Sequence, residues 1–220
     1  MGLNSASNKE PLRILEIGCG SGGIAHYFAT HPTLSCNVTA IDVHDNRQIC
    51  EGYDFYTVVG TELPFANNSF DLVITNHVIE HVGEYAQQLQ HVKEIARVLT
   101  ITGQCYLAVS NRWMLIEPHY SLKFLSWWPK RWRSKYLKPW NKGDFYDCEP
   151  FSLGALEKLL DETQFNYTNL SVEATRVTFD LEKPDSAITK LITKTPTKIL
   201  SLFKPIIPTL IYKLKTTNNE

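Results

Sequence analysis

The sequence has no long apolar run and no paired cysteines, and each absence excludes a class of protein. No uncharged apolar stretch reaches the roughly 20 residues that a transmembrane helix needs, so we expect no membrane span. The five cysteines form no CxxC pair and no regular framework, which predicts reduced thiols instead of a disulfide scaffold. The N-terminus has no basic region followed by an apolar core, so we expect no secretory signal. Together these absences favour a cytoplasmic protein with a packed core.

Acidic residues are scarce in two stretches of the chain, although the formal net charge is only −1. Residues 1–110 hold eleven Asp or Glu against five Lys or Arg. Residues 111–142 hold eight Lys or Arg and one acid, and residues 183–215 hold seven Lys and one acid. All five tryptophans lie between Trp113 and Trp140. An acidic scaffold therefore carries two basic segments, one of them rich in tryptophan.

Short apolar segments alternate with helical patterns over the first half of the chain. We expect strands over residues 12–17, 37–42, 54–59, 70–75 and 104–109. Helical spacing is clearest over residues 84–99, with shorter helices over 24–30 and 46–51 and a loop over 60–69. Further along we expect a helix capped by Ser152 and strands over 165–172 and 209–215. Strands alternating with helices predict a parallel sheet, in an α/β, Rossmann-like doubly wound fold.

Two insertions interrupt this alternation. The Trp-, Lys- and Arg-rich residues 111–150 follow the fifth strand, and we expect them to form a lid over the substrate. Residues 183–208 lie between the sixth and seventh strands and carry Ile, Leu and Phe at helical spacing. That spacing predicts two short amphipathic helices split at Pro196. We interpret residues 1–220 as a single domain with these two insertions.

A glycine-rich turn follows the first predicted strand. Residues 16–23 read EIGCGSGG, which satisfies both G-x-G-x-G and G-x-G-x-x-G. Such glycines let the backbone approach a ligand, and the next helix presents its N–H groups to a carboxylate or phosphate. Asp42 ends the second predicted strand, where an acid can bind the ribose hydroxyls of a nucleoside. A nicotinamide dehydrogenase is the alternative, but Glu16 suits a cationic amino group better than a pyrophosphate.

Four blocks along the chain resemble one enzyme family. They read EIGCGSGG, then ID, then LPFANNSFDLV, then NHVIEHV. In this order they resemble the class I S-adenosylmethionine-dependent methyltransferases, in particular the type 11 group that includes ubiquinone/menaquinone-biosynthesis methyltransferases. The resemblance implies a seven-stranded sheet with the last strand antiparallel, and S-adenosylmethionine as the cofactor.

The resemblance also assigns residues to each part of S-adenosylmethionine. At the amino-acid end it places Glu16, Gly18, Cys19, Gly20 and Gly22. On the ribose and beside the adenine it places Asp42, Val43 and His44. Along the adenine edge it places the loop of Gly60, Thr61, Glu62 and Leu63, and beside the methyl donor Asn76 and His77. The chain departs from the family at Gly60 and Thr61, where an acid is common, so backbone groups or Glu62 are expected to contact the adenine.

Three histidines are candidates for the general base that a hydroxyl nucleophile would use, namely His77, His81 and His119. We favour His119, which lies in the first insertion, within an EPHY stretch similar to type 11 methyltransferases of saccharide and cell-envelope pathways. A structural role is the alternative for each histidine. His77 and His81 are four residues apart, but the HVIEH order differs from HExxH of zinc proteases and a third ligand is not evident. We therefore expect no metal.

The two basic segments suggest the acceptor. Trp beside Lys and Arg suits a lipid headgroup region, a phosphate-bearing substrate or a nucleic acid, whereas a packed lid with a solvated rim needs none of these. We expect O-methylation of a membrane-proximal or lipid-linked acceptor such as a saccharide, by a protein that is peripheral on the inner, anionic face of a membrane. The alternative is a soluble small-molecule methyltransferase acting on a phenol, carboxylic acid or quinone precursor. A nucleic-acid methyltransferase is disfavoured, because Asn76 is not followed by Pro-Pro-Tyr, and a non-enzymatic scaffold is disfavoured by the intact glycines. The oligomeric state stays open.

Overall fold

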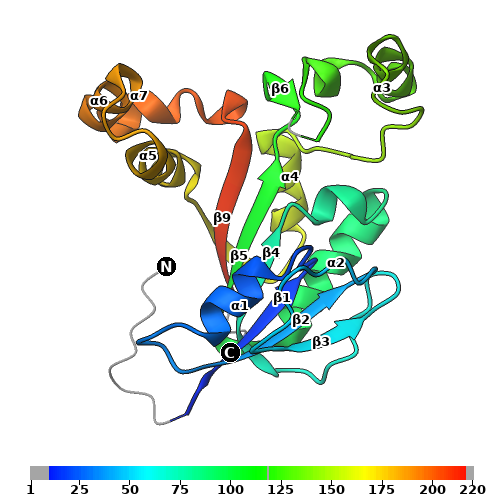
Figure 1. Cartoon of the computed structure of the whole chain (residues 1–220), viewed down its shortest axis with the longest axis vertical. Coiled ribbons are helices and arrows are strands. Elements are labelled where there is room, and N and C mark those ends of the chain that lie inside the picture. The colour runs from blue at the N-terminus through cyan, green and yellow to red at the C-terminus, as the bar shows by residue number, and fades with distance from the viewer. Residues whose placement is uncertain (1–9, 118, 217–220) are drawn as a thin grey trace. The chain divides into compact units, whose positions relative to one another are not determined.

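The computed structural model describes residues 10–117 and 119–216. Its main sheet has seven strands in the order β3-β2-β1-β4-β5-β9-β8 (Figure 1). These strands are β1 (Leu12–Ile17), β2 (Cys36–Asp42), β3 (Asp54–Thr57), β4 (Phe70–Asn76), β5 (Leu99–Ser110), β8 (Phe165–Asn169) and β9 (Thr209–Thr216). β1 pairs in parallel with both β2 and β4, and β2 pairs in parallel with β3.

The last strand, β9, runs antiparallel to β5. Just beyond the end of β5, the Asn111 N–H donates to the carbonyl of Pro208, which precedes β9 (2.9 Å). At the opposite end, the Thr216 hydroxyl donates to the Ile101 carbonyl (2.8 Å). The start of each strand thus lies beside the end of the other. The predicted Rossmann-like sheet of seven strands with an antiparallel last strand is confirmed.

Helices cover both faces of the parallel part of the sheet. The chain moves along the sheet in one direction from β1 to β2 and in the other from β4 to β5. Right-handed crossovers therefore place α1 (Gly23–Ala29) and α2 (Tyr85–Val98) on opposite faces (Figure 1). Ala25 of α1 packs against Ile14 and Leu72, whereas Val92 and Ile95 of α2 are fully buried. With both faces covered, most residues of β1 and β4 are buried, and the carboxyl ends of these strands meet where the strand order reverses.

The chain divides into two compact units. The first comprises Met1–Leu107, Leu159–Thr168 and Lys213–Glu220, and the second comprises Ala108–Lys158 and Asn169–Tyr212. The elements that lie wholly in the second unit are β6 (Ile116–Glu117), β7 (Leu122–Lys123), η2 (Leu125–Trp127), α3 (Lys130–Leu137), η3 (Lys138–Trp140), α5 (Ser171–Glu182), α6 (Ala187–Lys194), α7 (Thr197–Ser201) and η4 (Lys204–Ile206). The single-domain interpretation stays a prediction.

Several local predictions are confirmed. Residues 60–69 form a loop between β3 and β4. The hydroxyl of Ser152 accepts the Ala155 N–H at the start of α4 (Leu153–Asp161), which is the predicted cap. α6 and α7 are the two predicted short helices, and Pro196 separates them.

Two local predictions are wrong, each for a hydrogen-bonding reason. Residues 46–51, all within the described part of the chain, form no helix. The N–H groups of Gln48 and Ile49 donate to the Ser21 carbonyl, which holds this segment against the glycine turn. The strand predicted over 165–172 ends at Asn169, because the Asn169 side chain accepts the Ser171 N–H (3.0 Å) and α5 begins there.

Candidate active site

The glycine turn after β1 has the backbone conformation that its sequence predicts. Gly18, Gly20 and Gly22 all have positive φ, of 71°, 50° and 82°. A Cβ on Gly18 would clash with the side chain of Val78, and a Cβ on Gly22 would clash with the hydroxyl of Tyr53. Glycine is therefore required at both positions, by backbone conformation and by lack of space.

The carboxylate of Asp42 is bonded to the glycine turn. Its Oδ2 accepts the N–H of Gly20 (2.9 Å), and its Oδ1 accepts the N–H of Val43 (2.7 Å). Asp42 ends β2, which lies next to β1 in the sheet, so adjacent strand ends bring these groups together. The carboxylate is held in one orientation at the mouth of the turn, where the ribose of a nucleoside would lie.

Glu16 lies beneath the turn as a buried carboxyl group. It is 3% exposed, and burial raises its pKa from 4.5 to about 7, with the Asp42 charge adding to the rise and a hydrogen bond from the Ala25 backbone opposing it. Its Oε2 has no hydrogen-bond partner among residues 10–117 and 119–216. A buried carboxylate oxygen that lacks a donor fits the ammonium group of S-adenosylmethionine.

A cavity of about 420 Å³ opens at the ends of β1, β2 and β4, within the first unit. Of the residues predicted from the sequence, it is lined by Gly18, Asp42, Val43, Thr61, Leu63, His77 and His81. The predicted cofactor-binding residues outside its lining are Glu16, Cys19, Gly20, Gly22, His44, Glu62 and Asn76. The lining also includes Gly60, from the loop predicted to contact the adenine edge, and six residues that were not predicted to line it: Ile17, Ile41, Val58, Val78, Val82 and His91. The volume and mostly apolar lining fit a nucleoside, while the roles of the individual residues stay predictions.

His77 has a strained backbone and a buried carboxylate partner. It directly follows β4, with a φ of 58° that costs a non-glycine residue about 1 kcal/mol. Its Nδ1 donates to Oε1 of Glu80 (3.1 Å), whose side chain is fully buried in η1 (Ile79–His81). Because the Glu80 carboxylate accepts a hydrogen bond from Nδ1–H, the neutral ring carries its lone pair on Nε2. Strain of this kind concentrates at functional sites.

His91 is a buried neutral imidazole in the wall of the same cavity. It is 2% exposed on α2, and burial lowers its pKa from 6.5 to about 4, with the Glu80 charge opposing the shift. Its Nε2 has no hydrogen-bond partner in the described part of the chain. A signal in the sequence was its place on the apolar stripe of α2, one residue before Val92.

A second carboxylate–imidazole pair lies in the second unit. Glu117, at the end of β6, is 1% exposed, and its Oε1 accepts from Nδ1 of His119 (2.8 Å). Its Oε2 accepts the Tyr120 N–H (2.7 Å). The hairpin β6–β7 thus presents the predicted base, His119, with one tautomer fixed. Pro118, within the predicted EPHY stretch, lies outside the described residues.

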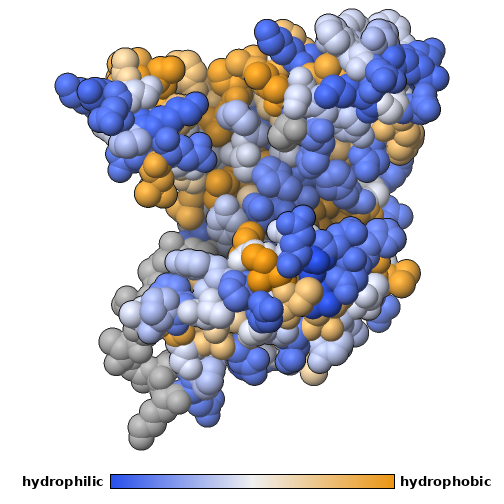
Figure 2. All heavy atoms as spheres, in the orientation of Figure 1, coloured by the Kyte–Doolittle hydropathy of each residue, from blue (hydrophilic) through white to orange (hydrophobic). Residues whose placement is uncertain are grey.

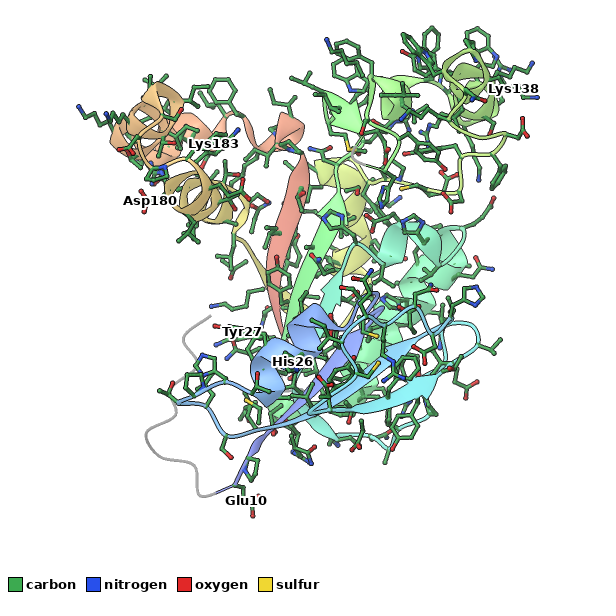
Figure 3. All side chains as sticks on the ribbon, in the orientation of Figure 1. Glu10, His26, Tyr27, Lys138, Asp180 and Lys183 are labelled. Atoms are coloured by element: carbon green, nitrogen blue, oxygen red, sulfur yellow. The ribbon has the colours of Figure 1, made fainter. Side chains whose placement is uncertain are left out.

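The tryptophan-rich segment packs its aromatic rings on one another. Trp128 contacts Trp132 (5.8 Å between centroids) and Tyr136 (5.9 Å), and Tyr136 contacts Trp140 (6.4 Å). The tryptophans Trp127, Trp128, Trp132 and Trp140 are still 39%, 38%, 45% and 56% exposed. Figure 3 labels Lys138, at the start of η3, among the basic side chains here.

The described residues form neither a cluster of metal ligands nor a membrane-spanning helix. Among the described residues, no three His, Cys, Asp or Glu side chains come together in a way that could hold a metal ion. Within those same residues, no helix is both long and apolar enough to cross a bilayer.

Known proteins show the same domain. A family model described as "Methyltransferase domain" (Methyltransf_11) matches residues 15–107. Cyclopropane-fatty-acyl-phospholipid synthase of Escherichia coli (strain K12) is 35% identical over 78 residues, which is 34% of this chain and 20% of that protein. Probable tRNA methyltransferase 9B of Bos taurus is 29% identical over 129 residues, 59% of this chain and 25% of that protein. The matches thus span a quarter or less of these two relatives.

Solved structures share the fold. An S-adenosylmethionine-dependent methyltransferase from Mesorhizobium loti superposes with a TM-score of 0.60 at 14% identity, over 96% of this chain and 93% of that one. The glycine turn, Asp42 and the cavity lie within the stretch that the family model matches. Residues 15–107 therefore match the type 11 group of class I S-adenosylmethionine-dependent methyltransferases, and S-adenosylmethionine is the cofactor of that domain.

Proposed function

We propose that the protein transfers the methyl group of S-adenosylmethionine to a hydroxyl oxygen, with His77 as the general base. The observation that carries this proposal is the His77–Glu80 pair, because it belongs to the same unit as the donor cavity and His77 lines that cavity. A carboxylate-paired imidazole is suited to accept the proton of a hydroxyl. His119 with Glu117 is the same chemical arrangement on the other unit, and stays the second candidate.

The donor supplies a methyl group on a positively charged sulfur. During transfer a carbon–oxygen bond forms as the carbon–sulfur bond breaks, and S-adenosylhomocysteine leaves. The hydroxyl proton passes to Nε2 of His77, and the resulting imidazolium is stabilised by the buried Glu80 carboxylate. Asp42 and the glycine turn hold the nucleoside in place, so that alignment supplies much of the rate acceleration.

We further propose a membrane-proximal or lipid-linked acceptor, such as a saccharide, and a peripheral position on the cytoplasmic face of a membrane. The exposed tryptophans beside Lys and Arg support this choice, since that combination suits the headgroup region. The names of the two relatives point to different acceptors, a fatty-acyl phospholipid for one and tRNA for the other. The proposed acceptor therefore rests on the exposed tryptophans and basic residues of this chain and not on its relatives.

The proposal is tested by methyl labelling of cell fractions. Purified protein is incubated with methyl-labelled S-adenosylmethionine and either a lipid extract, total RNA or the aqueous small-molecule fraction of the source cells. We expect label in the lipid extract, in an ether that survives mild alkali. Label in RNA or in the aqueous fraction would overturn the lipid-linked acceptor, and an alkali-labile product would indicate a carboxyl acceptor.

Two variants compare the bases. His77→Ala should lower transfer by about 100-fold or more while the affinity for S-adenosylhomocysteine changes less than about tenfold. His119→Ala is the matched variant of the second pair. A large loss in His119→Ala with little change in His77→Ala would reassign the base to His119.

A further inference from the structure

Helix α6 (Ala187–Lys194) buries a polar side chain, Thr189, and leaves two apolar side chains exposed. Thr189 is 2% exposed, and its hydroxyl donates to the carbonyl of Lys183 at 2.6 Å. Lys183 directly follows α5 and is labelled in Figure 3. Ile188 and Leu191 are three residues apart, which puts them on one side of α6, and they are 57% and 67% exposed. When an amphipathic helix packs on its own unit, its apolar side chains are normally the ones that are buried.

The apolar exposure continues beyond α6. The large apolar side chains with the highest exposure in the neighbouring elements are Val177 (58%), Leu181 (77%), Ile199 (49%), Leu202 (77%), Phe203 (53%) and Ile206 (47%). Figure 2 shows hydrophobic residues at the surface over α6 and α7. A group of exposed apolar side chains of this extent in one segment marks an interaction site.

The charges around these apolar side chains indicate the kind of partner that would bind them. Residues 183–208 hold five Lys and a single acid, Asp185. Lys190 and Lys194 lie on α6 itself, next to the exposed Leu191. Lysine is depleted where proteins bind one another, whereas apolar side chains flanked by lysine are typical of helices that lie on anionic bilayers. Charge complementarity therefore favours a lipid surface over a protein.

We propose that the outer face of α6, which we define as Ile188, Lys190, Leu191 and Lys194, docks the protein on an anionic lipid bilayer. Ile188 and Leu191 insert among the acyl chains, and the two lysines contact the headgroup phosphates. This inference rests on the proposed function, because it names the surface that brings the enzyme to a lipid-linked acceptor.

The test is co-sedimentation with vesicles at low salt. One set of vesicles is phosphatidylcholine alone, and the other is equal parts of phosphatidylcholine and phosphatidylglycerol. The protein should bind the anionic vesicles and lose binding as salt rises. Ile188→Ser with Leu191→Ser should weaken binding by about 100-fold, because each removes an apolar side chain that the bilayer buries. Lys190→Gln with Lys194→Gln should weaken binding to the anionic vesicles by about tenfold and leave binding to phosphatidylcholine vesicles unchanged.

A matched control is Ile101→Ser, which removes an isoleucine that is 65% exposed on β5 in the first unit and should leave vesicle binding unchanged. Wild-type protein that stays in the supernatant, or an α6 double variant that binds as tightly as wild type, would overturn the inference. So would a wild-type dimer that Ile188→Ser with Leu191→Ser converts to a monomer, since the occupant would then be a second copy.

Calorimetry with S-adenosylhomocysteine on the same preparations separates the two proposals. A protein that binds S-adenosylhomocysteine and transfers methyl groups but does not bind vesicles would overturn the docking surface alone. The proposed function would then still hold. Vesicle binding without transfer to any hydroxyl acceptor would remove the proposed function instead.

Discussion

We expect Glu16 to couple the stability of the ligand-free protein to the binding of S-adenosylmethionine. Burial raises its pKa from 4.5 to about 7, so the folded state binds more protons than the unfolded state between these values. The free energy of unfolding therefore falls as pH rises from about 4.5 to about 7, and is constant above that range. A shift of this size corresponds to about 3 kcal/mol of lost stability at pH values above about 7.

Glu16→Gln removes this titration and keeps the shape of the side chain. The variant should exceed wild type in free energy of unfolding by up to about 3 kcal/mol at about pH 8, and by less than about 1 kcal/mol at about pH 4.5. Urea unfolding followed by circular dichroism at both pH values measures this difference. Glu51→Gln, which changes an exposed carboxylate, is the control and should differ little from wild type at either pH. An equal effect of Glu16→Gln at both pH values would refute the reasoning.

Binding of the donor should convert the Glu16 carboxyl group from its protonated form to its ionised form. Below about pH 7 the carboxyl is protonated, and an incoming ammonium group favours its ionised form, so binding should release a proton. Calorimetry of S-adenosylhomocysteine binding in two buffers of different ionisation enthalpy measures that release. In Glu16→Gln the release should vanish and the affinity should fall by about tenfold or more. Wild-type binding with no buffer dependence would contradict this role.

Three further substitutions test the cavity. Asp42→Asn should lower the affinity for S-adenosylhomocysteine by about 100-fold in calorimetry. The reason is that the two charge-assisted hydrogen bonds expected from the ribose hydroxyls to the carboxylate would weaken. Gly18→Ala should destabilise the protein by about 2 kcal/mol or more in urea unfolding, since the added methyl group meets Val78 at a positive φ. His91→Phe should make stability less sensitive to acid, because wild type loses stability as pH falls from 6.5 to about 4 and the variant lacks that titration. Thermal unfolding across that pH range measures the effect.

The glycine turn and the position of Asp42 beside it could be predicted because their signals are local. Glycine is favoured where φ is positive, so the spacing of Gly18, Gly20 and Gly22 in the sequence predicts the turn directly. Asp42 could be placed because it ends a strand adjacent to β1, and parallel strands bring their carboxyl ends to one edge. Thr61 and Leu63 followed from the family resemblance, and both line the cavity.

The remainder of the cavity depends on packing between distant segments. Val58 and Val82 are ordinary apolar residues, and only the folded chain brings them to one wall. The pairing of His77 with Glu80 depends on the short η1 turn after β4, which no pattern of apolar spacing predicts. The same holds for residues 46–51, where bonds to the Ser21 carbonyl replace the predicted helix.

Helix α6 shows why an amphipathic pattern predicts a helix but not the side that it buries. The pattern of Ile188 and Leu191 against Thr189 is the same whichever face packs inward. Inside the second unit, the Thr189 hydroxyl donates to a backbone carbonyl at the end of α5, so burying threonine satisfies a hydrogen bond that burying leucine could not. Ile188 and Leu191 are then left exposed, and the lysines beside them are the basis for the proposed contact with an anionic bilayer.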